Sequence, residues 1–122
     1  MSRPSDLLAL DSLTRLHWIG IVAASVTAAV HVGLGVDIFP GTFGILFLFA
    51  SAGYLVGIVA ILLDFHRRSF YLLGIPFTAG QIVLWFALNQ PIPPISVVEA
   101  IDKIAQIVLV VALVVLYRRE RR

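Results

Sequence analysis

Four long apolar stretches limit what this chain can fold into more than any other feature. A helix needs about 20 apolar residues to cross the hydrocarbon core of a bilayer. Stretches of that length run from about 16 to 36, 42 to 63, 69 to 88 and 97 to 117. Only 13% of the residues are charged and 60% are hydrophobic, whereas a soluble domain has about 25% charged residues. The sequence therefore predicts a single transmembrane domain and argues against a water-soluble enzyme.

The connections between the predicted spans are short. The first two cover residues 37–41 and 64–68, and the third contains Pro91, Pro93 and Pro94, which stop one helix before the next begins. Short connections make consecutive helices antiparallel neighbours. We therefore expect an all-α fold, an up-and-down bundle of four transmembrane helices.

The cations lie almost entirely on one side of this predicted bundle. Eight arginines fall near the two termini and in the second connection, and the lysine, Lys103, lies inside the fourth span. Basic residues stay on the cytoplasmic side of membrane proteins. We therefore expect a multi-pass protein of the cell membrane with both termini in the cytoplasm. Its basic ends would contact lipid head groups rather than nucleic acid.

Polar residues in the fourth span follow a helical spacing. Glu99, Asp102, Lys103 and Gln106 are spaced so that they share one face of a helix. A charge that faces lipid costs on the order of 2.5–3.5 kcal/mol. This polar stripe should therefore face a pocket in the bundle, water or a partner chain, and all three alternatives stay open.

The other spans carry polar residues at depths that match this stripe. His31 lies in the outer half of the first span, and Tyr54 and Gln81 lie near the middle of the second and third. Buried polar side chains stabilise helix contacts, but intramembrane ionisable groups also mark ligand, ion and proton pathways. The predicted ligand-binding residues are His31, Tyr54, Gln81, Trp85, Asp102 and Gln106.

Small residues in the first two spans predict close contacts between helices. Gly20, Ala24 and Ala28 recur every four residues in the first span, and Gly53 and Gly57 have the same spacing in the second. Small side chains at this spacing let the backbones of membrane helices approach each other. We predict that these five residues pack against neighbouring helices.

Histidine placement raises the question of a b-type haem. His17 and His31 share the first predicted helix, but no second span carries a matched pair, and His66 is the remaining histidine. One haem held between His17 and His66 would make the protein an electron carrier. Apart from that alternative, we expect no cofactor.

Motifs of known catalytic sites are absent from the sequence. It has no cysteine, no glycine-rich phosphate loop and no dinucleotide fingerprint. We therefore expect a protein that is not an enzyme and that acts through helix packing, as an oligomer or as an accessory subunit. The first alternative to this role is an outward-facing polar pocket that binds or transports a small ligand, an ion or a proton, formed by His31, Gln81, Asp102 and Gln106. The haem-binding electron carrier is the second alternative.

Several stretches carry a resemblance to a known family. They are Leu16–Gly20 in the first span, Gly74–Thr78 and Gln81–Trp85 in the third, and Ala100–Gln106 in the fourth. On these motifs the chain resembles, over nearly its full length, a family of small uncharacterised four-span membrane proteins of haloarchaea. The resemblance implies the four-span fold and no particular activity.

Overall fold

The computed structural model describes residues 8–89 and 96–120. Within these ranges the helices are α1 (Arg15–Asp37), α2 (Thr42–Leu62), α3 (Arg67–Asn89) and α4 (Val97–Arg119), preceded by the 3-10 turn η2 (Leu10–Ser12). The prediction of an all-α chain is confirmed. Each α-helix begins and ends within two residues of a predicted span. The predicted turn at Pro91, Pro93 and Pro94 lies outside the described residues.

Each of these α-helices is long and apolar enough to cross a membrane. Helix α3 continues through Pro76, which lacks the backbone N–H that a helix interior normally uses. Such prolines are tolerated in membrane helices because neighbouring groups satisfy the freed carbonyl. The length and composition of the helices indicate a multi-pass membrane protein.

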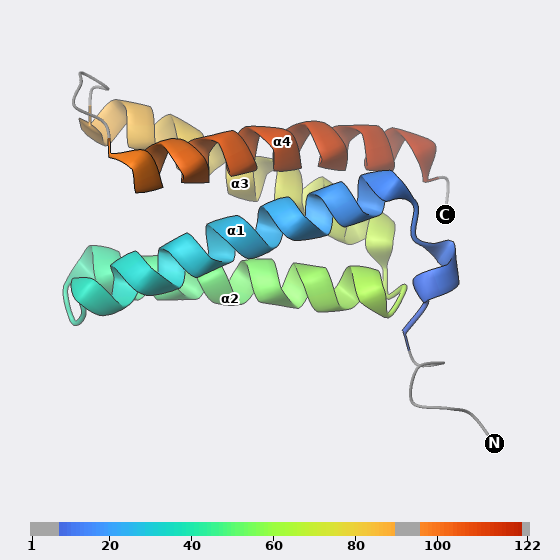
Figure 1. The fold of residues 1–122 in the computed structure, drawn as a ribbon, viewed down its shortest axis with the longest axis horizontal. Coiled ribbons are helices and arrows are strands. Elements are labelled where there is room, and N and C mark those ends of the chain that lie inside the picture. The colour runs from blue at the N-terminus through green and yellow to red at the C-terminus, as the bar shows by residue number, and fades with distance from the viewer. Residues whose placement is uncertain (1–7, 90–95, 121–122) are drawn as a thin grey trace.

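Consecutive helices run in opposite directions, so the described chain begins and ends at the same end of the bundle (Figure 1). Helix α1 packs against α2 and α4, and α4 also packs against α3, whereas α2 and α3 make few contacts with each other. Helices α1 and α4 are accordingly the most buried, and α2 and α3 the most exposed. The bundle is therefore loose along the seam between α2 and α3.

Small residues bring α1 close to α4. Gly20, Ala24 and Ala28 are buried on α1. A Cβ atom added to Gly20 would lie 3.7 Å from the Cβ atom of Ala112 on α4, which is ordinary van der Waals contact. The small side chains on α1 thus allow the close helix approach that packing in lipid requires.

The two glycines predicted to mediate packing of α2 have different surroundings. A Cβ atom added to Gly53 would lie 2.8 Å from Cζ of Phe77, so this glycine makes room for an aromatic ring of α3. A Cβ atom added to Gly57 would meet no atom within 4 Å. Gly53 therefore lies at a helix contact, and Gly57 faces open space.

The turn between α2 and α3 is held by Arg67. Its Nε and Nη2 atoms donate hydrogen bonds of 2.8 and 2.6 Å to the carbonyl oxygen of Ile61, and Nε lies 3.4 Å from Oδ1 of Asp64. Asp64 and His66 have φ angles of 53° and 46°, a left-handed conformation that costs a non-glycine residue about 1–3 kcal/mol. The sequence placed Arg67 in the connection, but it begins α3 and is only 4% exposed.

A buried polar network as the candidate functional site

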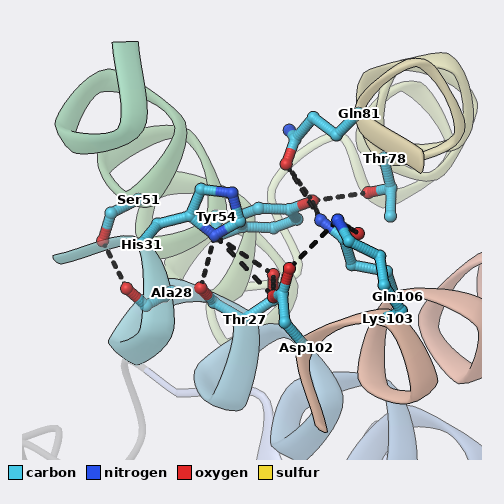
Figure 2. Close-up of polar contacts among 10 residues, drawn as sticks. All are labelled: Thr27, Ala28, His31, Ser51, Tyr54, Thr78, Gln81, Asp102, Lys103 and Gln106. Carbon is cyan, nitrogen blue, oxygen red and sulfur yellow. Dashed lines mark hydrogen bonds and ion pairs between the residues drawn. The ribbon is translucent and has the colours of Figure 1, made fainter. Parts of the chain in front are cut away.

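Asp102 lies in the first third of α4 and is 5% exposed. Its Oδ1 atom accepts a hydrogen bond from the hydroxyl of Thr27 on α1, and its Oδ2 atom lies 3.1 Å from Nζ of Lys103. Nδ1 of His31 lies 3.8 Å from Oδ1. Figure 2 shows these groups gathered around the carboxylate. Both carboxylate oxygens therefore have partners within the chain, as a buried charge requires.

His31 is held in place by its own helix. Its Nδ1 atom lies 2.7 Å from the carbonyl oxygen of Thr27. A carbonyl oxygen can only accept a hydrogen bond, so this contact places a proton on Nδ1. The imidazole ring also packs edge-on against Phe47 of α2, with 5.4 Å between ring centroids. His31 thus contacts Asp102 electrostatically while its Nδ1–H group bonds to the backbone.

The polar contacts continue from Lys103 towards α3. Lys103 Nζ donates a 2.7 Å hydrogen bond to Oε1 of Gln106, and Nε2 of Gln106 donates a 3.0 Å hydrogen bond to Oε1 of Gln81. The hydroxyl of Tyr54 lies 3.1 Å from the same Gln81 oxygen and 3.2 Å from the hydroxyl of Thr78. These bonds connect α4 with α2 and α3 in the middle of the bundle.

We call these eight side chains the polar network. It draws on α1, α2, α3 and α4, and its members are Thr27, His31, Tyr54, Thr78, Gln81, Asp102, Lys103 and Gln106 (Figure 2). Ser51 adds a further link between α1 and α2 through a 3.0 Å hydrogen bond to the carbonyl oxygen of Ala28. The network connects side chains that lie far apart in the sequence.

The polar stripe of α4 divides into two parts. Asp102, Lys103 and Gln106 turn into the bundle and meet partners there. Glu99 lies in the first turn of α4, where its backbone N–H donates a 3.0 Å hydrogen bond to the Ser96 hydroxyl, the helix N-cap. The deeper part of the stripe therefore faces the interior of the bundle.

Trp85 lies beside the polar network. Nζ of Lys103 is 5.5 Å from the centroid of the Trp85 ring, within the range of a cation–π interaction. The structure thus brings five of the six predicted ligand-binding residues into the network and places the sixth next to it. Sequence reasoning missed Thr27 as a site residue, although its position four residues before His31 puts both on one face of α1.

His17 and His66 have separate surroundings at the end of the bundle where α1 begins. Nδ1 of His17 accepts a 3.0 Å hydrogen bond from the backbone N–H of Thr14 and so caps α1. His66 is exposed, and its ring packs against Phe65. Within residues 8–89 and 96–120, no cluster of three or more His, Asp or Glu side chains could hold a metal ion. The pairing of His17 and His66 around a haem stays a prediction.

Comparison with known proteins assigns the chain to a family. A model of a family of unknown function matches residues 5–117, nearly the whole chain. This chain belongs to the family of unknown function DUF7475. No curated protein and no solved structure matches it. The resemblance to an uncharacterised family is thereby confirmed, and the family description assigns no activity.

Proposed function

We propose that this is a non-catalytic protein of the cell membrane that acts through its packed helices, as an oligomer or as an accessory subunit of another membrane protein. The proposal rests on Asp102, whose two carboxylate oxygens are occupied by Thr27 and Lys103. These partners hold the carboxylate within the bundle, and breaking such a buried ion pair costs about 3–5 kcal/mol.

Stabilising the bundle is a sufficient role for the polar network. In a membrane, apolar side chains gain little by leaving lipid for a helix contact, so interhelical hydrogen bonds of about 0.6–2 kcal/mol matter. The bond between Tyr54 and Thr78 joins α2 to α3, the pair of neighbours with the fewest other contacts. The network therefore fixes the helix positions that a binding surface needs.

A groove on the outer side of α1 and α4 supports assembly. It has a volume of about 530 Å³ and apolar walls that include Val22 and Ile104, exposed by 60% and 63%. Ala23 and Ala105 line the groove as well, and small residues of this kind accept a ridge of side chains from a neighbouring helix. A second transmembrane helix is the partner that fits such a groove.

Assembly is tested by cross-linking the full chain in its native membranes. Val22→Trp fills the groove, and Val83→Trp, which changes an equally exposed valine on α3, is the matched control. We expect a cross-linked oligomer or complex in the wild type and in Val83→Trp, and its loss in Val22→Trp. A wild-type protein that cross-links to neither itself nor another protein would refute the proposal.

We also propose that the arginine-rich end of the bundle faces the cytoplasm and that the source is a haloarchaeon, which the excess of arginine over lysine fits. The orientation is testable because the chain has no cysteine. Ser12→Cys and Thr42→Cys introduce single thiols at exposed positions at opposite ends of the bundle. A membrane-impermeant maleimide should label only Thr42→Cys in intact cells, and the reverse labelling would invert the orientation.

A proton or ion pathway is the second candidate function. It is favoured by the proximity of two ionisable groups, His31 and Asp102, at one end of a chain of hydrogen bonds that reaches Thr78. The full chain in liposomes loaded with a pH-sensitive dye separates the two candidates. Proton flux that Asp102→Asn abolishes would favour the pathway, and wild-type liposomes as tight as empty ones would favour the non-catalytic role.

A further inference from the structure

A cavity of about 310 Å³ lies between α2 and α3, separate from the groove on α1 and α4. Residues of α1 and α4 also line it, among them Ala24 and Leu113. Protein interiors are close-packed and leave few voids larger than a water molecule. A space of this size, in the range of small-molecule binding sites, therefore needs an occupant.

Gly57 contributes to this space because it has no side chain. It lines the cavity, and a Cβ atom added to it would meet nothing within 4 Å. Gly53, one turn away on α2, is instead covered by the ring of Phe77. Gly57 thus provides no side chain at the point where α2 and α3 separate.

The cavity reaches the surface of the bundle. Its lining combines buried residues such as Tyr54 with strongly exposed ones, Val56 at 57% and Leu73 at 63%. The exposed residues belong to α2 and α3, both long and apolar enough to cross a membrane, and these helices contact each other little. The medium outside the opening is therefore lipid hydrocarbon.

The cavity is elongated along the helices. Its lining extends from Gly53 to Ile61 on α2 and from Phe70 to Thr78 on α3, which corresponds to about 12 Å at the rise of an α-helix. At mid-span it is lined by Tyr54 and Thr78, whose hydroxyls hydrogen-bond to each other. Its other end, at Ile61, lies next to Arg67, which hydrogen-bonds the Ile61 carbonyl.

The polarity of the two ends indicates how an occupant would be oriented. Arg68, Arg118 and Arg119 are exposed at the end of the bundle where the cavity meets Ile61. Clusters of basic residues between or beside transmembrane helices bind the anionic head groups of lipids. A phosphate at this end would allow an attached hydrocarbon chain to run along the apolar walls towards Tyr54.

We propose that the cavity between α2 and α3 binds one hydrocarbon chain of an anionic phospholipid, with the phosphate among the arginines at the end of the bundle. Water is a poor occupant because apolar cavities stay dry and take up hydrocarbons. A helix of a second copy is too wide, since a helix with its side chains is about 10–12 Å across. A hydrocarbon chain matches the length and the direction of the space.

The test uses the full chain in liposomes containing phosphatidylglycerol with a photoactivatable acyl chain, and cross-linked residues are mapped by mass spectrometry. We expect labelling of the wild type to concentrate on cavity residues such as Leu73 and Phe77. Labelling spread evenly over lipid-facing residues, Val83 included, would overturn the proposal. This outcome can be read from the wild type alone, so it does not depend on the folding of any variant.

Two glycine variants provide the specificity control. Gly57→Leu places a side chain in the cavity, whereas Gly80→Leu places one on α3 where a Cβ atom also meets nothing within 4 Å. We expect cavity labelling to fall by roughly tenfold in Gly57→Leu, because the leucine displaces several methylene groups of the bound chain, and to persist in Gly80→Leu. Equal labelling of both variants would contradict the assignment. Equal labelling by a photoactivatable phosphatidylcholine would overturn the preference for an anionic head group.

Discussion

Thr27 on α1 donates a hydrogen bond to Asp102 on α4, joining residues that are 75 positions apart in the sequence. Thr27 is fully buried and Asp102 nearly so. The bond links the two most buried helices of the bundle at the carboxylate that is most costly to leave unpaired. Thr27 therefore gives α1 a direct hydrogen bond to the polar network, beside the contact that His31 makes with the same carboxylate oxygen.

Replacing Thr27 with valine keeps the shape of the side chain and removes its hydroxyl. We expect Thr27→Val to lower the free energy of unfolding by about 1–2 kcal/mol, because Asp102 loses a buried hydrogen-bond donor. Thermal unfolding of the purified protein in detergent measures the change. Ser25→Ala is the control, since the Ser25 hydroxyl bonds only to the Ile21 carbonyl of its own helix; an equal loss there would show that the link to α4 contributes nothing.

The contact between Asp102 and Lys103 predicts that their contributions to the free energy of unfolding are strongly coupled. Asp102→Asn or Lys103→Met alone leaves one buried charge without its partner, a loss of about 3–5 kcal/mol. The double variant removes both charges and should lose clearly less than the sum of the single losses. Unfolding in a denaturing detergent, followed by circular dichroism, measures all three variants, and additive losses would mean that the two charges are not coupled.

Arg67 should matter more for stability than its arginine neighbours. Arg67→Ala removes two hydrogen bonds to the carbonyl oxygen of Ile61, and we expect a loss of about 1.5–3 kcal/mol because the donor is charged. Arg118→Ala changes an exposed arginine at the same end of the bundle and should cost less than about 0.5 kcal/mol. Equal melting temperatures for the two variants would contradict this role.

Two glycines near the turn between α1 and α2 should respond to alanine with opposite signs. At Gly44, a Cβ atom would lie 2.9 Å from the carbonyl oxygens of Gly35 and Ile38, so Gly44→Ala should destabilise the protein by about 1–3 kcal/mol through overpacking. At Gly33 a Cβ atom meets nothing within 4 Å, and Gly33→Ala should stabilise α1 by up to about 1 kcal/mol. Thermal unfolding in detergent compares both with the wild type, and the same sign for both would show that the turn adjusts freely.

An absorption spectrum tests the haem alternative directly. Nδ1 of His17 accepts a hydrogen bond from the backbone N–H of Thr14, which leaves the proton of the neutral ring on Nε2, so neither ring nitrogen offers a free lone pair to iron. We therefore expect protein purified from its native membrane to show no Soret band before or after reduction with dithionite. A reducible band that His17→Ala and His66→Ala both remove would establish an electron carrier and overturn the non-catalytic proposal.

The helices could be predicted from the sequence because apolar length alone determines a membrane span. The cost of placing Asp102 in lipid argued against a stripe that faces lipid, but it left a pocket, water and a partner chain as alternatives for what the stripe faces. The role of Thr27 could not be predicted in the same way, since a hydroxyl in a helix can bond its own backbone, as Ser25 does. Arg67 was placed in the connection because the third apolar stretch of the sequence begins at Ser69, whereas α3 begins two residues earlier.

The cavity could not be predicted from the sequence either. Gly53 and Gly57 form one spacing motif, yet one is covered by Phe77 and the other faces open space. The motif indicates that helix backbones can approach each other closely. Whether each glycine faces a neighbouring helix or open space depends on where α3 crosses α2. That crossing is a property of the assembled bundle, which a single helix does not encode.

The seam between α2 and α3 is joined at two heights, by Arg67 at the turn and by the Tyr54 hydroxyl at mid-span. The stretch between these attachments includes Gly57, where a Cβ atom would meet nothing within 4 Å, and belongs to the helix pair that makes few contacts. A lipid chain bound there as proposed would enter from the side, between α2 and α3, and would leave the contacts of α1 with α2 and α4 in place.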